Sequence, residues 1–137
     1  MTERHRPHIL VIDDAQPVLD LYGEILRTEG YQVSLTAHAD GGIDEIKRAK
    51  ADLIILDLVF HGETPGVPLI QAVKQDTDTT HIPVVVCTGA LRVMDAVEDD
   101  LARQGVAMIR KPFDIDDLLA MVRGGLTQSG LARVAHP

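Results

Sequence analysis

The apolar run from Leu53 to Leu56 constrains the fold of this chain more than any other segment, and an acid, Asp57, follows it directly. Four consecutive large aliphatic residues, two of them β-branched, are typical of a strand that is buried on both faces. Such strands belong to parallel sheets that helices cover on both sides, and ligands bind beyond the carboxyl ends of those strands. Asp57 is therefore a candidate functional residue, although a strand-terminal acid can also simply cap a helix.

Strand and helix patterns alternate along the rest of the chain. Residues 8–12, 82–87 and 106–110 are further apolar runs and predicted strands, and polar and apolar residues alternate over 31–36. That alternation predicts an edge strand with one wetter face. Between the strands, apolar residues recur every three or four positions, which predicts amphipathic helices. These helices are predicted from Pro17 to Gly30 (with the stripe Val18, Leu21, Tyr22, Ile25 and Leu26), over about 40–50, from Pro68, over about 93–104 and from Asp114.

Five strands that alternate with five helices predict an α/β fold, a three-layer α/β/α sandwich around a five-stranded parallel sheet. Because the second strand has the pattern of an edge, the strand order 2-1-3-4-5 is favoured. In that order the first and third strands are neighbours at the switch point. The ends that carry Asp13, Asp14 and Asp57 then lie side by side, with Thr88 and Lys111 next to them.

Length and composition indicate a single domain over residues 1–137, with a core at about 7–126 and a polar tail at 127–137. The net charge of −8 argues against direct nucleic-acid binding. No apolar run approaches the roughly 18 residues that a membrane span needs, and residues 1–8 have no export signal. Cys87 has no second cysteine to pair with, which fits a cytoplasmic location, and we expect it to be a small core residue.

The acids at the predicted strand ends favour phosphoryl chemistry. Three converging carboxylates repel one another unless a cation binds them, and an all-oxygen site suits Mg²⁺. The Lys111 ammonium and the Thr88 hydroxyl could hold phosphoryl oxygens, whose charge must be stabilised during transfer. Asp57 could then act as the nucleophile and form an aspartyl phosphate.

Motifs at the ends of four predicted strands carry a family resemblance. An acidic pair follows the first strand, Asp57 the third and Thr88 the fourth, and Lys111-Pro112-Phe113 follows the fifth. Over about residues 7–126 the chain resembles a response-regulator receiver domain of two-component signalling. The resemblance implies the flavodoxin-like, CheY-like form of the predicted fold and a cis peptide bond between Lys111 and Pro112. It also implies a stand-alone receiver, which is a signalling domain and not an enzyme, since it catalyses only its own phosphorylation and dephosphorylation.

The resemblance further implies the roles of the site residues. Asp57 would accept a phosphoryl group from a histidine kinase or phosphotransfer protein. Asp14, Asp57 and the Val59 carbonyl would bind Mg²⁺ directly, and Asp13 would act largely through water. Thr88 and Lys111 would bind the phosphoryl oxygens, and a downstream protein would dock on the fourth helix, fifth strand and fifth helix.

Two departures from the family pattern keep alternatives open. Met108 stands where receivers commonly carry an aromatic residue, and His61 stands where the loop after the phosphoacceptor often has a proline. A receiver-like interaction scaffold that works without phosphorylation is therefore one alternative. A small phosphatase of the haloacid-dehalogenase kind is another, but it needs an Asp-x-Asp motif on the first strand. A flavodoxin-like cofactor binder would need a hydroxyl-rich loop there instead of Asp13-Asp14-Ala15.

Overall fold

The computed structural model describes residues 6–38, 41–58 and 66–128. Within these ranges, five strands pair in parallel in the order β2-β1-β3-β4-β5, so the predicted fold and strand order are confirmed. The strands are β1 (His8–Ile12), β2 (Gln32–Thr36), β3 (Leu53–Leu56), β4 (Val84–Thr88) and β5 (Ala107–Arg110). The helices are α1 (Gln16–Thr28), α2 (Gly42–Ala49), α3 (Gly66–Gln75), α4 (Leu91–Arg103) and α5 (Ile115–Gln128).

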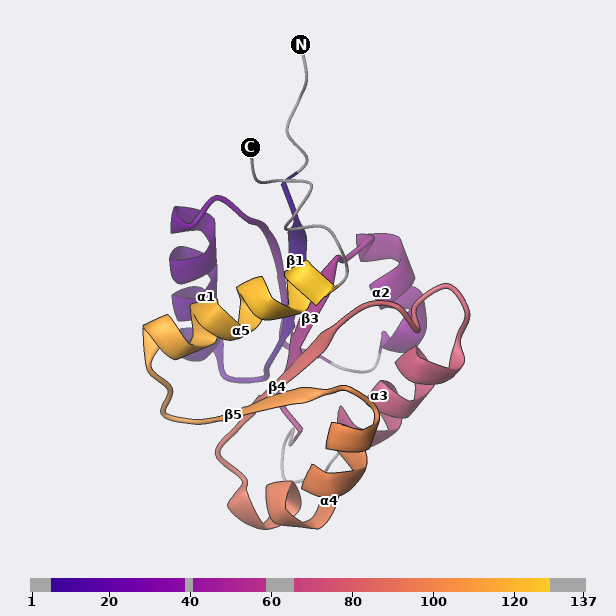
Figure 1. Ribbon diagram of the computed structural model, residues 1–137. Helices are drawn as coiled ribbons and strands as arrows, with labels where there is room; N and C mark the ends of the chain where they lie inside the picture. Colours follow the sequence, from indigo (N-terminus) through magenta and orange to yellow (C-terminus); the bar gives the residue numbers. More distant parts are fainter. Residues whose placement is uncertain (1–5, 39–40, 59–65, 129–137) are drawn as a thin grey trace.

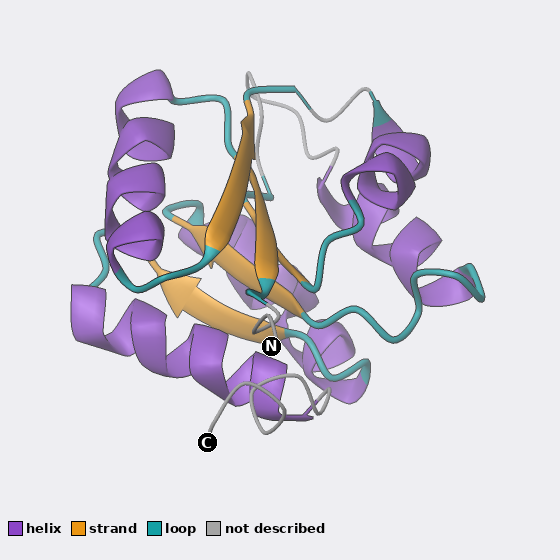
Figure 2. Cartoon of the chain, turned by 90° about the horizontal axis from the view of Figure 1, so that it is seen from above, coloured by secondary structure: helices purple, strands orange, loops and turns teal. Residues whose placement is uncertain are grey.

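Helices cover both faces of the sheet: α1 and α5 lie on one side, and α2, α3 and α4 lie on the other (Figures 1 and 2). Alternate strand residues point to opposite faces, as the pleat requires. On β3, for example, Ile54 and Leu56 pack toward α2–α4, while Leu53 and Ile55 pack toward α1 and α5. Each β3 residue is thus buried, and burying a large aliphatic side chain contributes about 1.5–3 kcal/mol.

The core toward α2–α4 is called the aliphatic layer below, and the core toward α1 and α5 is called the aromatic layer. The buried residues of the aliphatic layer are Leu10, Ile12, Ile46, Ala51, Ile54, Leu56, Leu58, Leu69, Ile70, Val73, Ile82, Val84, Val86, Leu101 and Val106. Those of the aromatic layer are Ile9, Val11, Leu19, Tyr22, Leu26, Leu53, Ile55, Val85, Cys87, Leu118, Leu119, Val122 and Leu126, with Tyr31 and Phe113 packed against them.

The predicted stripe of α1 is wrong at Leu21, which is 45% exposed. The buried face of this helix is instead centred on Leu19, Tyr22 and Leu26. At 3.6 residues per turn, Leu21 lies nearly opposite the centre of that face, whereas Leu19 lies within it. Leu19 and Leu21 are both apolar, so the sequence pattern does not show which of them faces the sheet. The packing of α1 on the sheet determines this.

Other bounds differ by a few residues. Strand β1 matches its prediction, whereas α3 begins at Gly66 and not at Pro68, and α5 continues to Gln128, inside the predicted polar tail. Asp114 precedes α5 as its predicted N-cap, since its Oδ1 accepts a hydrogen bond of 2.8 Å from the Asp116 N–H. Among the described residues, no helix has the length and hydropathy of a membrane span.

Candidate functional site

The strand register brings the predicted site residues to one edge of the sheet. Ile12 pairs with Leu56, so Asp13 and Asp57 follow neighbouring positions, and Thr88 pairs with Arg110, the residue before Lys111. Carboxylate oxygens of Asp13, Asp14 and Asp57 lie within 4.8 Å of one another. The structure therefore assembles at one place the groups that the sequence predicted to converge.

Asp13 is the most enclosed of the three acids, with a side chain only 2% exposed. Its Oδ1 accepts a hydrogen bond of 3.0 Å from the Ala15 N–H, and its Oδ2 accepts one of 2.5 Å from the Lys111 ammonium. Its own N–H donates to the Thr36 carbonyl at 3.1 Å, which ties the end of β1 to β2. Both carboxylate oxygens thus already have protein donors.

Lys111 bridges two of the three acids. Its Nζ donates to Asp13 Oδ2 and, at 3.1 Å, to Asp57 Oδ2. Burial by itself would lower the pKa of the Lys111 ammonium, but the hydrogen bonds and charges of Asp13 and Asp57 together outweigh burial, and the pKa stands above its usual value. The lysine is therefore held in its charged form between the two carboxylates, where an anionic ligand could bind to it.

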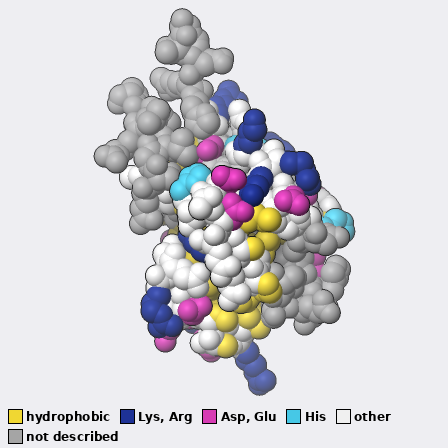
Figure 3. Space-filling view, turned by 90° about the vertical axis from the view of Figure 1, so that its right-hand side faces the viewer, with side chains coloured by type: hydrophobic (Ala, Val, Ile, Leu, Met, Phe, Trp, Pro, Cys, Tyr) yellow, Lys and Arg dark blue, Asp and Glu magenta, His cyan; other side chains and the backbone are white. Residues whose placement is uncertain are grey.

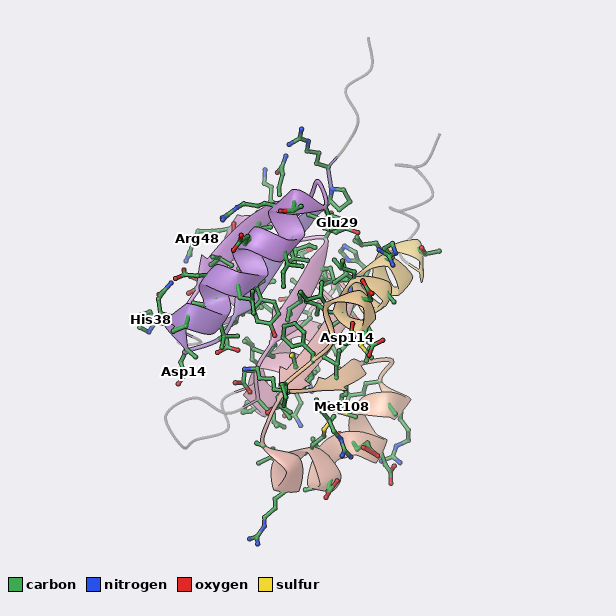
Figure 4. All side chains as sticks on the ribbon, turned by 90° about the vertical axis from the view of Figure 1, so that its left-hand side faces the viewer. Asp14, Glu29, His38, Arg48, Met108 and Asp114 are labelled. Carbon is green, nitrogen blue, oxygen red and sulfur yellow. The ribbon has the colours of Figure 1, made fainter. Side chains whose placement is uncertain are left out.

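Two acids of the cluster are open enough to bind a metal. Asp14 and Asp57 are partly exposed, and Asp14 lies at the N-terminal end of α1 (Figure 4). Three carboxylates and one ammonium leave an excess of negative charge, which a divalent cation would offset. Hard oxygen donors with room for water suit Mg²⁺. The predicted ligand Val59 and the flanking His61 lie outside the described residues.

Thr88 and Lys111 are joined through the backbone. The Lys111 N–H donates to the Thr88 carbonyl at 2.9 Å, and the peptide bond between Lys111 and Pro112 is cis, as predicted. The Thr88 hydroxyl is buried and accepts a hydrogen bond of 3.1 Å from the Ala90 N–H. Its oxygen keeps a proton to donate, so a small rotation of this side chain could present it to a neighbouring oxyanion.

Gly66 supports the site in a way that the sequence analysis missed. A Cβ at this position would lie 2.7 Å from the Asp57 carbonyl oxygen and 2.8 Å from the Leu58 Cα. Only glycine allows the first turn of α3 to approach the end of β3 so closely, and the Gly66 N–H also donates to the Leu58 carbonyl at 3.3 Å. The sequence does contain a signal for this close approach, namely a glycine two residues before the predicted helix start at Pro68.

Met108 and Cys87 lie beside the site on opposite faces of the sheet. Met108 is partly buried and packs against the aliphatic layer, on the α4 side of β5 (Figure 4). Cys87 is fully buried in the aromatic layer, so the expectation that it is a small core residue is confirmed. The position of the expected aromatic residue is thus filled by a flexible thioether side chain.

The sequence profile of the response regulator receiver domain matches residues 9–123. The chain belongs to this family. Among curated relatives, the receiver is 31% identical to the nitrogen assimilation regulatory protein NtrX of Azorhizobium caulinodans, over 91% of this chain and 27% of that protein. It is 30% identical to the DNA-binding dual master transcriptional regulator RpaA of Synechocystis, over 90% of this chain and 50% of that protein. The chain thus spans half or less of the length of these two relatives.

Solved structures agree on the fold of the receiver. A response regulator receiver domain protein (CheY-like) from Methanospirillum hungatei has a TM-score of 0.80 at 24% identity, over 92% of this chain and 98% of that chain. NtrX of Brucella abortus has a TM-score of 0.78 at 30% identity, over 94% of this chain and 29% of that chain. The first likeness concerns the fold alone.

Proposed function

We propose that this receiver is a signalling switch that accepts a phosphoryl group on Asp57 from a histidine kinase or phosphotransfer protein. The observation that carries the proposal is the Lys111 ammonium, which bridges Asp13 and Asp57 in a cluster of three carboxylates. A carboxylate that faces a fixed ammonium is a suitable nucleophile, because the same cation can bind the incoming phosphoryl oxygens.

The transfer is a displacement at phosphorus. A carboxylate oxygen of Asp57 bonds to phosphorus while the P–N bond of the donor phosphohistidine breaks, and the released imidazole nitrogen takes a proton. Lys111 and Thr88 would bind the oxygens of the acyl phosphate that forms. Bound Mg²⁺ would offset the negative charge of both the acids and the phosphoryl group.

The proposed metal ligands are Asp14, Asp57 and the Val59 carbonyl, with Asp13 acting through water. An indirect role of Asp13 fits the hydrogen bonds that already engage both of its oxygens. Asp14 and Asp57 are more accessible than Asp13, which suits direct coordination by residues that also admit solvent.

Phosphorylation adds about −1.5 to −2 charges at the sheet edge. We infer that Thr88 and Lys111 then move toward the phosphoryl group and shift a two-state equilibrium, which a downstream protein reads at α4, β5 and α5. The chain would act in the cytoplasm as a phosphoacceptor and not as an enzyme. We also propose that 1–137 forms a single receiver domain that itself binds neither membrane nor nucleic acid, consistent with its net charge of −8.

The test is labelling by acetyl phosphate with and without Mg²⁺. We expect one acid-stable, base-labile phosphoryl group per chain that requires Mg²⁺ and is absent in Asp57→Asn. Asp44→Asn, which changes an exposed acid on α2, is the matched control and should label normally. Labelling that persists in Asp57→Asn would exclude Asp57 as the acceptor. If the wild type neither labels nor binds beryllofluoride with Mg²⁺, the phosphorylation-independent scaffold is the better hypothesis.

A further inference from the structure

The Tyr22 hydroxyl is a buried polar group that the proposed reaction does not use. Tyr22 is 1% exposed, and among the described residues its hydroxyl is the single buried side-chain polar atom without a hydrogen-bond partner. Burying a hydroxyl without a partner is unfavourable, whereas a leucine or phenylalanine would fill such a position at no polar cost. Because the hydroxyl has no partner, the contacts of the ring are the part of this residue that can have a role in the fold or the site.

The ring of Tyr22 packs on the turn that carries Lys111. It stacks on Phe113 with ring centroids 5.4 Å apart and an angle of 24° between the ring planes. Tyr22 is on α1, whereas Phe113 lies two residues after Lys111, between β5 and α5. A stacked pair of this kind contributes about 0.5–1.5 kcal/mol beyond the area that it buries.

The turn from Lys111 to Asp114 is fixed at three points. The Lys111 N–H is bound to the Thr88 carbonyl, the Phe113 ring lies on Tyr22, and Asp114 caps α5. Two of these contacts hold the ends of the turn to β4 and α5. The ring stack is the contact that holds its middle to α1.

The hydroxyl end of Tyr22 is buried in the layer that also contains Cys87. Burial raises the pKa of the Tyr22 hydroxyl most strongly, the Cys87 thiol raises it further, and the charges of Asp13 and Asp57 add to the effect. Cys87 is the residue before Thr88 on β4. Tyr22 and Cys87 thus belong to the same buried layer, which ends at the residue before Thr88.

We propose that Tyr22 is a positioning residue for the phosphoryl site: its ring holds the turn 111–114 against α1 and so sets where the Lys111 ammonium lies between Asp13 and Asp57. The effect on phosphorylation rests on the proposed function. The effect on the position of Lys111 does not depend on that function. A shift of about 1 Å in a reacting or binding group can lower a rate up to 100-fold, so a stack outside the site can matter to the chemistry.

The first experiment reads the position of Lys111 without any phosphorylation. NMR of the intact chain with ¹³C-labelled lysine ε-carbons observes four lysines, Lys47, Lys50, Lys74 and Lys111, and Lys111→Arg assigns the signal of interest. We expect Tyr22→Leu and Phe113→Leu to shift the Lys111 signal and leave the other three unchanged. Tyr22→Phe, which keeps the ring, should leave all four in place.

The second experiment measures the rate of acetyl phosphate labelling. Tyr22→Leu and Phe113→Leu should each slow labelling roughly 10- to 100-fold at saturating Mg²⁺. The double variant should be no slower than either single variant, because both remove the same stack. Tyr31→Leu is the matched control: it removes the other described tyrosine ring of the aromatic layer and should leave the rate unchanged.

The outcomes separate the two proposals. Unchanged Lys111 signals and unchanged labelling in folded Tyr22→Leu would overturn the positioning role while the phosphoacceptor function stands. A wild type that does not label, together with a Lys111 signal that moves in Tyr22→Leu, would overturn the proposed function and support the positioning role. If Tyr22→Leu does not fold, Phe113→Leu decides by the same readouts, with Tyr22→Phe as the control that keeps the ring. Additive slowing in the double variant would also overturn the proposal.

Discussion

The two cores on either face of the sheet are built from the same strands but differ in chemistry. The buried residues of the aliphatic layer are all aliphatic, and Met108 packs at its edge. The aromatic layer contains a thiol, a buried hydroxyl and the stacked rings of Tyr22 and Phe113. A buried hydroxyl by itself does not distinguish the two faces, because Thr79 is buried beside the aliphatic layer and donates to the Val73 carbonyl at 2.8 Å. What distinguishes the aromatic layer is the ring stack, which packs on the turn that carries Lys111.

Charged groups on the outer surface of the aliphatic side contribute little to holding its helices in place. Figure 3 shows acidic and basic side chains next to one another on this side, with hydrophobic atoms exposed between them. Lys47 on α2 pairs with Asp76 at 2.8 Å and with Asp78 at 3.6 Å, which ties α2 to the end of α3. Exposed pairs of this kind contribute about 0–1 kcal/mol each. The helices here are held mainly by the aliphatic core beneath them.

The largest expected effect tests whether the two layers contribute equally to the free energy of unfolding. Ile70→Ala in the aliphatic layer and Leu118→Ala in the aromatic layer each truncate a fully buried side chain. Each should lower the free energy of unfolding by about 2–5 kcal/mol, measured by urea titration, because transfer and cavity terms add. If only one of the two variants is strongly destabilised, stability is concentrated in one layer and the comparison must be revised.

Gly66→Ala tests the one place where the aliphatic side reaches the site. Because its Cβ would meet the backbone of Asp57 and Leu58, we expect a loss of about 1–3 kcal/mol in stability and slower acetyl phosphate labelling. The matched control is Gly124→Ala on α5, where a Cβ has no atom within 4 Å. That substitution should stabilise the helix by about 0.5–1 kcal/mol. Normal labelling in folded Gly66→Ala would show that the end of β3 tolerates displacement.

The smallest expected effect is a pH dependence specific to the aromatic layer. Burial raises the pKa of the Cys87 thiol to about 11. The folded chain therefore keeps the thiol proton above pH 8.5, where the unfolded chain loses it. The contribution of the protonated thiol to the free energy of unfolding is therefore complete below about pH 8.5 and is lost as the pH rises toward 11. Between pH 8 and pH 10, stability should fall by roughly 1–2 kcal/mol more in the wild type than in Cys87→Ala. Equal losses would show that the thiol is not shielded.

Much of the fold and the site could be predicted because the signals are local. Four large aliphatic residues before Asp57 predict a buried strand, and the β/α alternation then restricts the strand order. Once the order is fixed, the strand ends with Asp13, Asp14, Asp57, Thr88 and Lys111 must meet at one edge. The structure places Asp13, Asp14 and Asp57 together and puts Lys111 between two of them.

What only the tertiary structure decided depends on contacts between segments that are far apart in the chain. The apolar pattern of α1 contains both Leu19 and Leu21, and only packing on the sheet buries the first and exposes the second. The sequence shows a glycine at 66 but not the backbone that lies beneath it. It shows Tyr22 and Phe113 but not that their rings stack, because local periodicity sets which way a side chain faces and only the assembled fold sets which side chain it meets.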